Sequence, residues 1–113
     1  MQKSPIFIMT AIATAAVAAN RFVGLLTGAH CASAAKAQGV SQYAAATGEA
    51  FAVDVLGTSI VEAGAAFGAG VALKAAADGS GKAIAQAGAG EIIAYSVQGA
   101  TADGQKVEVL LKF

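Results

Sequence analysis

The residues of this chain that could carry out chemistry are few and scattered. His30 is the only histidine, and it stands beside the only cysteine, Cys31. Neighbouring residues on an extended backbone point to opposite faces, so these two side chains cannot easily share a metal ion. We therefore expect no metal site, and we interpret Cys31 as a small buried apolar residue rather than a reactive thiol. A single cysteine also excludes a disulfide within the chain.

One glycine-rich segment has part of a phosphate-binding pattern. Segment 79–82 (Gly-Ser-Gly-Lys) is similar to the end of such a loop, but the upstream glycine is replaced by Ala76 and the following hydroxyl residue by Ala83. We interpret the segment as a hairpin tip with a solvated lysine. No Gly-x-Ser-x-Gly pattern, which marks the nucleophile of many hydrolases, occurs in the chain.

The acidic residues are dispersed along the chain. Asp54 and Glu62 would be neighbours if the strands on either side of Gly57 paired with each other. Paired carboxylates need a cleft and raised pKa values for acid–base work, so we interpret both as surface charges. The sequence therefore predicts no catalytic residue, no cofactor and a protein that is not an enzyme. A site shared between subunits remains open as an alternative.

The elements that would position any site are mostly strands. Phe51, Val53 and Val55 recur at every second residue, which places their side chains on one face of an extended strand. Gly57 interrupts this alternation, and residues 58–62 predict a second, β-branched strand. This stretch decides the fold class, because the many alanines of the chain would otherwise favour helix.

Further short strands and turns follow the same reasoning. Asp-Gly-Ser-Gly at 78–81 and Asp103-Gly104 predict the turns of two hairpins. Residues 29–36 predict an irregular loop, and residues 44–48 predict a turn. The remaining predicted strands are 6–13, 21–26, 40–43, 71–75, 82–85, 91–97 and 107–111.

This spacing of strands predicts an all-β fold, a small β-barrel or β-sandwich built from hairpins. We expect one domain over residues 1–113, with residues 1–10 as an extended arm. At most one short helix is expected, near residues 42–47 or 13–20. No period long enough for a solenoid repeat is apparent.

The composition favours a component of an assembly. Hydrophobic residues make up 57% of the chain and charged residues only 12%, whereas about 25% charged is usual. So many apolar residues are difficult to bury in one small globule, which favours contacts with other subunits or a partner. Seven basic and seven acidic residues give a net charge of zero, so nucleic-acid binding is not expected. A net charge near zero also gives little protection against self-association.

The N-terminal segment has a second interpretation. A positive charge at Lys3, an apolar stretch over residues 6–19 and small residues at 16–18 together resemble a secretory signal peptide. Thr10 and Thr14 interrupt the apolar stretch, and we therefore favour an edge strand entered through a proline. The stretch is also too short and too interrupted for a transmembrane helix, so no membrane contact is expected.

Several segments taken in order resemble a known family. The order consists of an alternating strand, a Gly-Thr step, the sequence Val-Glu-Ala-Gly, a hairpin and a final strand reading Val-Glu-Val-Leu-Leu. This order is similar to that of the capsid cement, or head-decoration, proteins of tailed bacteriophages, over essentially the whole chain. The segments that carry the resemblance are 5–10 (Pro-Ile-Phe-Ile-Met-Thr), 15–23, Gly39-Val40, 48–64 and 104–111.

The resemblance implies a structural protein of the virion. Members of the family bind the outer surface of the assembled capsid, typically as homotrimers, and bridge neighbouring major-capsid subunits. It therefore implies a protein that is made in the cytoplasm of the bacterial host and ends on the outer capsid surface. A strand added by the N-terminal segment to a capsid sheet edge would suit such a role. The residues that we expect to contact the capsid are Gln2, Lys3, Ser4, Pro5, Ile6 and Phe7.

Two other functions remain open at this stage. One is an adhesin or binding module on the virion surface, which exposed aromatic residues in a shallow groove would favour; the chain contains no tryptophan. The other is a secreted β-domain behind a true signal peptide.

Overall fold

A computed structural model describes residues 5–25, 27–31, 36–76, 79–86 and 92–111. Within these ranges the chain forms strands and turns without a helix, which confirms the all-β prediction. Nor does this part of the chain contain a helix long and apolar enough to span a membrane. The strands are β1 (Pro5–Ile12), β2 (Phe22–Gly24), β3 (Ala37–Ser41), β4 (Ala50–Glu62), β5 (Ala72–Ala75), β6 (Ala83–Ala85), β7 (Ala94–Ser96) and β8 (Lys106–Leu111).

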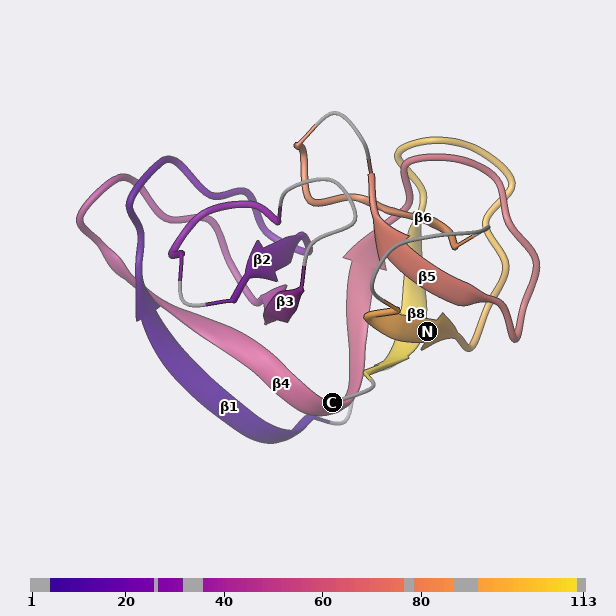
Figure 1. The fold of residues 1–113 in the computed structure, drawn as a ribbon, viewed down its shortest axis with the longest axis horizontal. Helices are drawn as coiled ribbons and strands as arrows, with labels where there is room; N and C mark the ends of the chain where they lie inside the picture. Colours follow the sequence, from indigo (N-terminus) through magenta and orange to yellow (C-terminus); the bar gives the residue numbers. More distant parts are fainter. Residues whose placement is uncertain (1–4, 26, 32–35, 77–78, 87–91, 112–113) are drawn as a thin grey trace.

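All these strands belong to one antiparallel, barrel-like sheet. Its hydrogen-bonded order is β2-β3-β4-β8-β7-β5-β6, and β1 pairs with β4 outside this path. Figure 1 shows β4 as a long bent strand that connects two groups of strands: β1, β2 and β3 lie beside its first half, and β5 to β8 lie beside its second half. The N-terminal strand is extended, as expected, and it is paired with its own chain over Pro5–Ile12.

The prediction that Gly57 separates two strands is wrong. Gly57 lies inside the continuous strand β4, with its backbone at a φ of +97°, a conformation that favours glycine. The halves of β4 do not pair with each other, because each finds other partners. The first half pairs with β1 and β3, and the second half pairs with β8. Gly57 therefore bends one strand instead of separating two.

The two predicted hairpins of the second half are confirmed. β5 pairs with β6 and β7 pairs with β8, with Gly81 and Gly104 at positive φ in the connecting turns. Both segments that could have held a short helix form bends and turns around an isolated β-bridge instead. Val17 and Ala45 form a bridge in which each N–H donates to the carbonyl of the other, at 2.9 Å in both directions. This pairing satisfies the backbone groups that a helix would have used.

The fold contains an internal duplication that the sequence does not reveal. In residues 5–56, which we call the first lobe, Ile12 of β1 stands opposite Ala50 of β4. In residues 57–111, the second lobe, Glu62 of β4 stands opposite Lys106 of β8 in the same register. The β2–β3 pair likewise corresponds to the β5–β7 pair, and the β3–β4 pair to the β7–β8 pair. The second half of β4 thus corresponds to β1, and β8 corresponds to the first half of β4.

Matching hydrogen bonds support this correspondence. Ser41 ends β3 and accepts from the N–H of Arg21 at 3.2 Å, while Ser96 ends β7 and accepts from the N–H of Val71 at 2.9 Å. Each hydroxyl also donates to the carbonyl three positions before that N–H, at 2.7 and 2.8 Å. Even the preceding turn is repeated, since Asn20 and Gly70 have φ values of 61° and 73°. The two lobes are therefore copies of one supersecondary unit.

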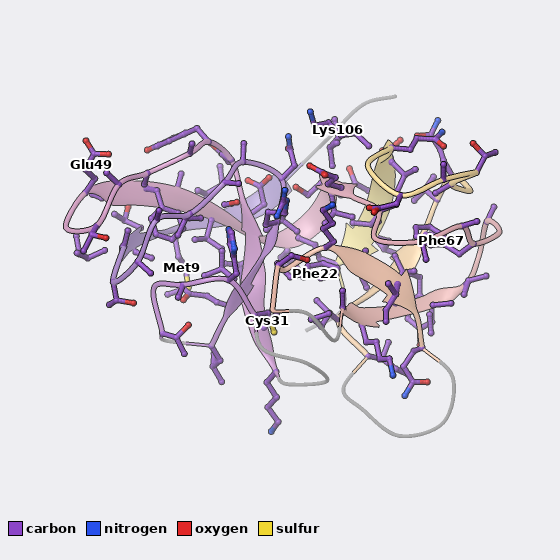
Figure 2. The ribbon with its side chains drawn as sticks, turned by 90° about the horizontal axis from the view of Figure 1, so that it is seen from above. Met9, Phe22, Cys31, Glu49, Phe67 and Lys106 are labelled. Carbon is purple, nitrogen blue, oxygen red and sulfur yellow. The ribbon has the colours of Figure 1, made fainter. Side chains whose placement is uncertain are left out.

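The apolar core consists of two clusters, and the larger one contains residues of both lobes. A smaller cluster, which includes Val23, Phe51 and Val53, fills the first lobe. A larger cluster fills the second lobe around Val107 and also includes Phe22, a residue of the first lobe. Figure 2 shows Phe22 near the middle of the molecule, between Met9 at one side and Phe67 at the other. The first lobe therefore contributes side chains to the core of the second.

Candidate interaction surfaces and the junction between the lobes

The structure gives His30 and Cys31 structural roles. The N–H of Ala18 donates to Nε2 of His30 at 2.9 Å, and burial, helped by the charge of Arg21, lowers the pKa of His30. Cys31 is fully buried, and burial raises the pKa of its thiol to about 11. Figure 2 places Cys31 close to Phe22 at the centre of the molecule. The prediction that Cys31 is buried is confirmed.

Asp54 and Glu62 are not the exposed surface charges that the sequence predicts. Asp54 is fully buried; its carboxylate accepts hydrogen bonds from Oγ of Ser59 at 2.6 Å and Nε2 of Gln42 at 2.5 Å. Because Ser59 follows the bend at Gly57, this contact joins the second lobe to the first. We call Gln42, Asp54 and Ser59 the junction cluster.

A second polar group joins the lobes beside the junction cluster. Glu62 lies 3.4 Å from Arg21 and 3.4 Å from Lys82, and its N–H donates to the carbonyl of Asn20 at 2.8 Å. Arg21 also donates to the carbonyl of Ser80 at 2.9 Å. The side chains of Arg21 and Glu62 are only 17% and 18% exposed, so this ion pair is partly shielded from water.

Segment 79–82 therefore contributes to the junction. Its backbone accepts a hydrogen bond from the first lobe, and Lys82 also pairs with Asp103 at 3.0 Å, a contact that raises the pKa of the lysine. In the part of the chain that the structure describes, no group of three or more His, Cys, Asp or Glu residues could hold a metal ion.

Besides Leu25 and Leu56, the large exposed aliphatic side chains of the described residues fall into two groups, one on each lobe. On β1, Ile8, Met9 and Ile12 are 47%, 36% and 58% exposed, and we call them the first apolar surface. On the second lobe, Val97 and Leu110 are each 48% exposed, and we call them the second apolar surface. Figure 2 shows Met9 on the side of the molecule opposite Phe67. Neither surface is covered by the described part of the chain.

A depression of about 230 Å³ adjoins the first apolar surface. It lies beside β1 and is lined by residues that include Met9, Ile12, Thr14, Gly28 and Gln38. None of its lining residues carries a charge. A site of this kind can accept an apolar side chain of a partner, and it lacks groups for acid–base or nucleophilic chemistry.

The expected capsid-contact residues lie at the beginning of β1 or before it. Gln2, Lys3 and Ser4 are outside the described residues. Pro5, Ile6 and Phe7 belong to β1, where the backbones of Pro5 and Phe7 stand opposite Gly57 and Leu56. Sequence reasoning missed the second apolar surface and the junction, because only the pairing of distant strands brings their residues together.

Aromatic residues do not form an exposed group in the described ranges. Phe22, Phe51 and Phe67 are buried, Tyr95 is half-buried, and Tyr43 is 50% exposed. A shallow aromatic groove, which would favour an adhesin, is therefore not found among these residues.

Comparison with known proteins agrees with the fold. The family described as phage cement protein matches residues 1–111 of the chain. Among solved structures, the N base of the head fiber gp8.5 of bacteriophage phi29 is similar, with a TM-score of 0.76 and 24% sequence identity over 94% of this chain and 93% of that chain. No match was found among curated proteins.

Proposed function

The chain belongs to the phage cement protein family and is thus a structural protein associated with the phage capsid, and we propose that it binds the outer surface of the shell as a homotrimer. In this role it would bridge neighbouring major-capsid subunits and resist their separation. Family membership suggests a protein that is not an enzyme.

The two apolar surfaces are the observation that carries this proposal. A monomer of this size gains nothing from leaving Ile12, Leu110 and Val97 about half exposed. Exposed apolar side chains on a protein with no net charge favour burial against other protein surfaces. Contacts made by several copies of a chain multiply, so that modest individual interfaces hold strongly to a lattice of repeated sites.

We further propose that residues 2–7 contact the capsid. Of the described strands, β4 alone pairs with β1, so one edge of β1 is available for a strand of another protein. Strand addition would give affinity through main-chain hydrogen bonds, and adjacent side chains would give specificity.

Binding to empty shells tests both parts of the proposal. Purified capsid shells that lack this chain are mixed with the protein, and bound chain is measured by co-sedimentation, together with the temperature at which the shells dissociate. We expect the wild type to bind and to raise that temperature, and a variant that begins at Pro5 to bind more weakly while β1 is retained. A variant with Lys36→Glu, which changes an exposed lysine elsewhere, is the control.

The two possible failures are distinct. If the wild-type chain does not sediment with any shell, before or after expansion, the capsid role is wrong. If it binds but the variant that begins at Pro5 binds equally well, residues 2–4 do not contribute to attachment, and that part of the proposed contact is wrong.

A further inference from the structure

The duplication allows the junction between the lobes to be compared with the exposed surfaces position by position. Arg21 corresponds to Val71, because each follows the repeated turn and donates its N–H to the equivalent serine. Glu62 corresponds to Ile12, because each is the last residue of its strand in the same register. The ion pair between the lobes thus corresponds to an apolar pair, of which Ile12 is 58% exposed and Val71 half-buried.

The junction cluster corresponds to three exposed apolar residues. Its aspartate, which stands opposite β3, corresponds to Leu110, which stands opposite β7. Gln42 corresponds to Val97, since each follows the equivalent serine of its lobe and donates its N–H to a carbonyl of the next strand. Its serine, on the second half of β4, corresponds to Met9 on β1. The equivalents therefore belong to the first and second apolar surfaces, at 36% to 48% exposure.

Both lobes thus use the same positions, but with different chemistry. In the chain these positions are polar where the two lobes meet, and they are apolar where each lobe has no neighbour. The exposed face of the first lobe is equivalent to the face that the second lobe contributes to the junction. The exposed face of the second lobe is equivalent to the face that the first lobe contributes to the junction. The two faces are complementary to each other, and the strands that carry them do not pair within the chain: β1 pairs with β4, and β8 pairs with β4 and β7.

We propose that a second copy of this chain completes the series: the first apolar surface of one copy docks against the second apolar surface of the next, in the arrangement of the junction. Met9 would then contact Leu110 and Val97 of the neighbouring copy, and Ile12 would contact its Val71. This deepens the proposed self-association, on which it rests, by naming the surfaces that meet.

A further pair of positions agrees with this assignment. Phe22 and Val40 stand opposite each other on β2 and β3, and both are fully buried in the core that spans the lobes. Their equivalents on β5 and β7 are Ala72 and Tyr95, which are only half-buried. The large and the small side chain have exchanged strands, so that the pair keeps a similar volume. The same packing can therefore be formed by a neighbouring copy.

The interface is heterologous, since a different face of each copy takes part. Such contacts close into rings when the rotation between units divides a full turn. Three copies would give a ring of six similar lobes, in which junctions within chains alternate with contacts between chains. In such a ring the end of β8 of one copy would lie near the start of β1 of the next copy. This arrangement would match the one within the chain, where Val55, at the end of the first half of β4, is followed by Gly57, at the start of the second half.

An exchange of charge tests the assignment directly. In Ile12→Glu a carboxylate faces Val71 of the neighbour without a partner, and we expect self-association to weaken by about 10²-fold or more. Adding Val71→Arg recreates between copies the ion pair that Arg21 and Glu62 form within the chain, and we expect the double variant to regain the wild-type mass. Tyr43→Glu, which alters an exposed residue outside both surfaces, is the control. Sedimentation velocity over a range of concentrations gives the mass, and circular dichroism confirms that each variant is folded.

Disulfide trapping gives a readout that does not depend on affinity. In the variant with Met9→Cys and Leu110→Cys, mild oxidation should link copies covalently up to the size of the closed ring. Cys31 should not interfere, because it is buried and its thiol has a pKa of about 11. Tyr43→Cys with Leu110→Cys is the matched control and should remain unlinked.

Each outcome has a defined meaning. The inference would be overturned if the wild-type chain stays monomeric at every concentration and the variant with Met9→Cys and Leu110→Cys forms no disulfide between copies. An oligomeric wild type whose mass is unchanged by Ile12→Glu would also overturn it, while self-association through another surface would stand. Both results are independent of capsid binding, so a failure here is distinguishable from a failure of the capsid role.

Discussion

Replacing Phe22 by alanine should destabilise both lobes together. Phe22 is fully buried, it belongs to β2 of the first lobe, and it packs in the cluster that fills the second. Removing a buried phenylalanine side chain costs about 3–5 kcal/mol, because the apolar contacts are lost and a cavity remains. A chain of 113 residues has an expected free energy of unfolding of about 6–17 kcal/mol, so the loss is a large fraction of the total.

Urea denaturation at a fixed protein concentration measures this loss. With a slope of about 2 kcal/mol per molar urea, the midpoint should fall by roughly 2 M, in a single transition with an unchanged slope. Amide hydrogen exchange should show reduced protection at Val107 in the second lobe as well as at Phe51 in the first. Tyr43→Ala, at an exposed position, should change the free energy of unfolding by less than about 0.5 kcal/mol. A loss below about 1 kcal/mol, or reduced protection in the first lobe alone, would refute the shared core.

Two other predictions concern single positions. A Cβ at Gly39 of β3 would overlap the backbone carbonyl of Asp54, so Gly39→Ala should lower the free energy of unfolding, measured by urea denaturation, by about 1–3 kcal/mol. The control is Gly68→Ala, whose Cβ would meet nothing closer than 3.9 Å and which should change this free energy by less than about 1 kcal/mol. Equal effects of the two substitutions would contradict this reasoning. The folded protein holds His30 neutral with a pKa below the usual 6.5, so the unfolded chain takes up the proton first and stability should be lost as the pH falls from about 7 through the lowered pKa. His30→Gln should reduce this pH dependence in thermal unfolding, and an identical dependence in wild type and variant would show that His30 does not contribute.

The sequence predicts the parts of this fold that local residues determine. The two hairpins follow from glycines in tight turns, and the first half of β4 follows from the alternation of apolar side chains. The continuity of β4 does not follow, because Gly57 interrupts the alternation and is held in the strand by partners distant in sequence. The burial of Asp54 does not follow either, since its hydrogen-bond partners become neighbours only when the lobes meet.

The duplication escapes sequence reasoning for a physical reason. Its signature is in backbone pairing, which few side chains determine: Ser41 and Ser96 are retained for their hydroxyls, and Asn20 and Gly70 both tolerate a positive φ. At most other positions the requirement is only for an apolar residue of suitable size. The positions with opposite chemistry, such as Asp54 and Leu110, are those where the surroundings of the two lobes differ.

The difference between polar and apolar contacts has a thermodynamic explanation. The junction joins two parts of one chain, so it forms without loss of translational freedom, and hydrogen bonds around Asp54 suffice to fix the geometry. Contact between copies must overcome an association cost of about 4–15 kcal/mol. Burying the exposed parts of Met9, Ile12, Val97 and Leu110, at about 1.5–3 kcal/mol for a whole side chain, would return roughly 3–6 kcal/mol per interface. That gain is too small for a stable dimer alone, whereas closing a ring or binding to a capsid lattice adds further contacts for the same loss of freedom. The same apolar positions that would make assembly reversible in solution would then make it persistent on the shell.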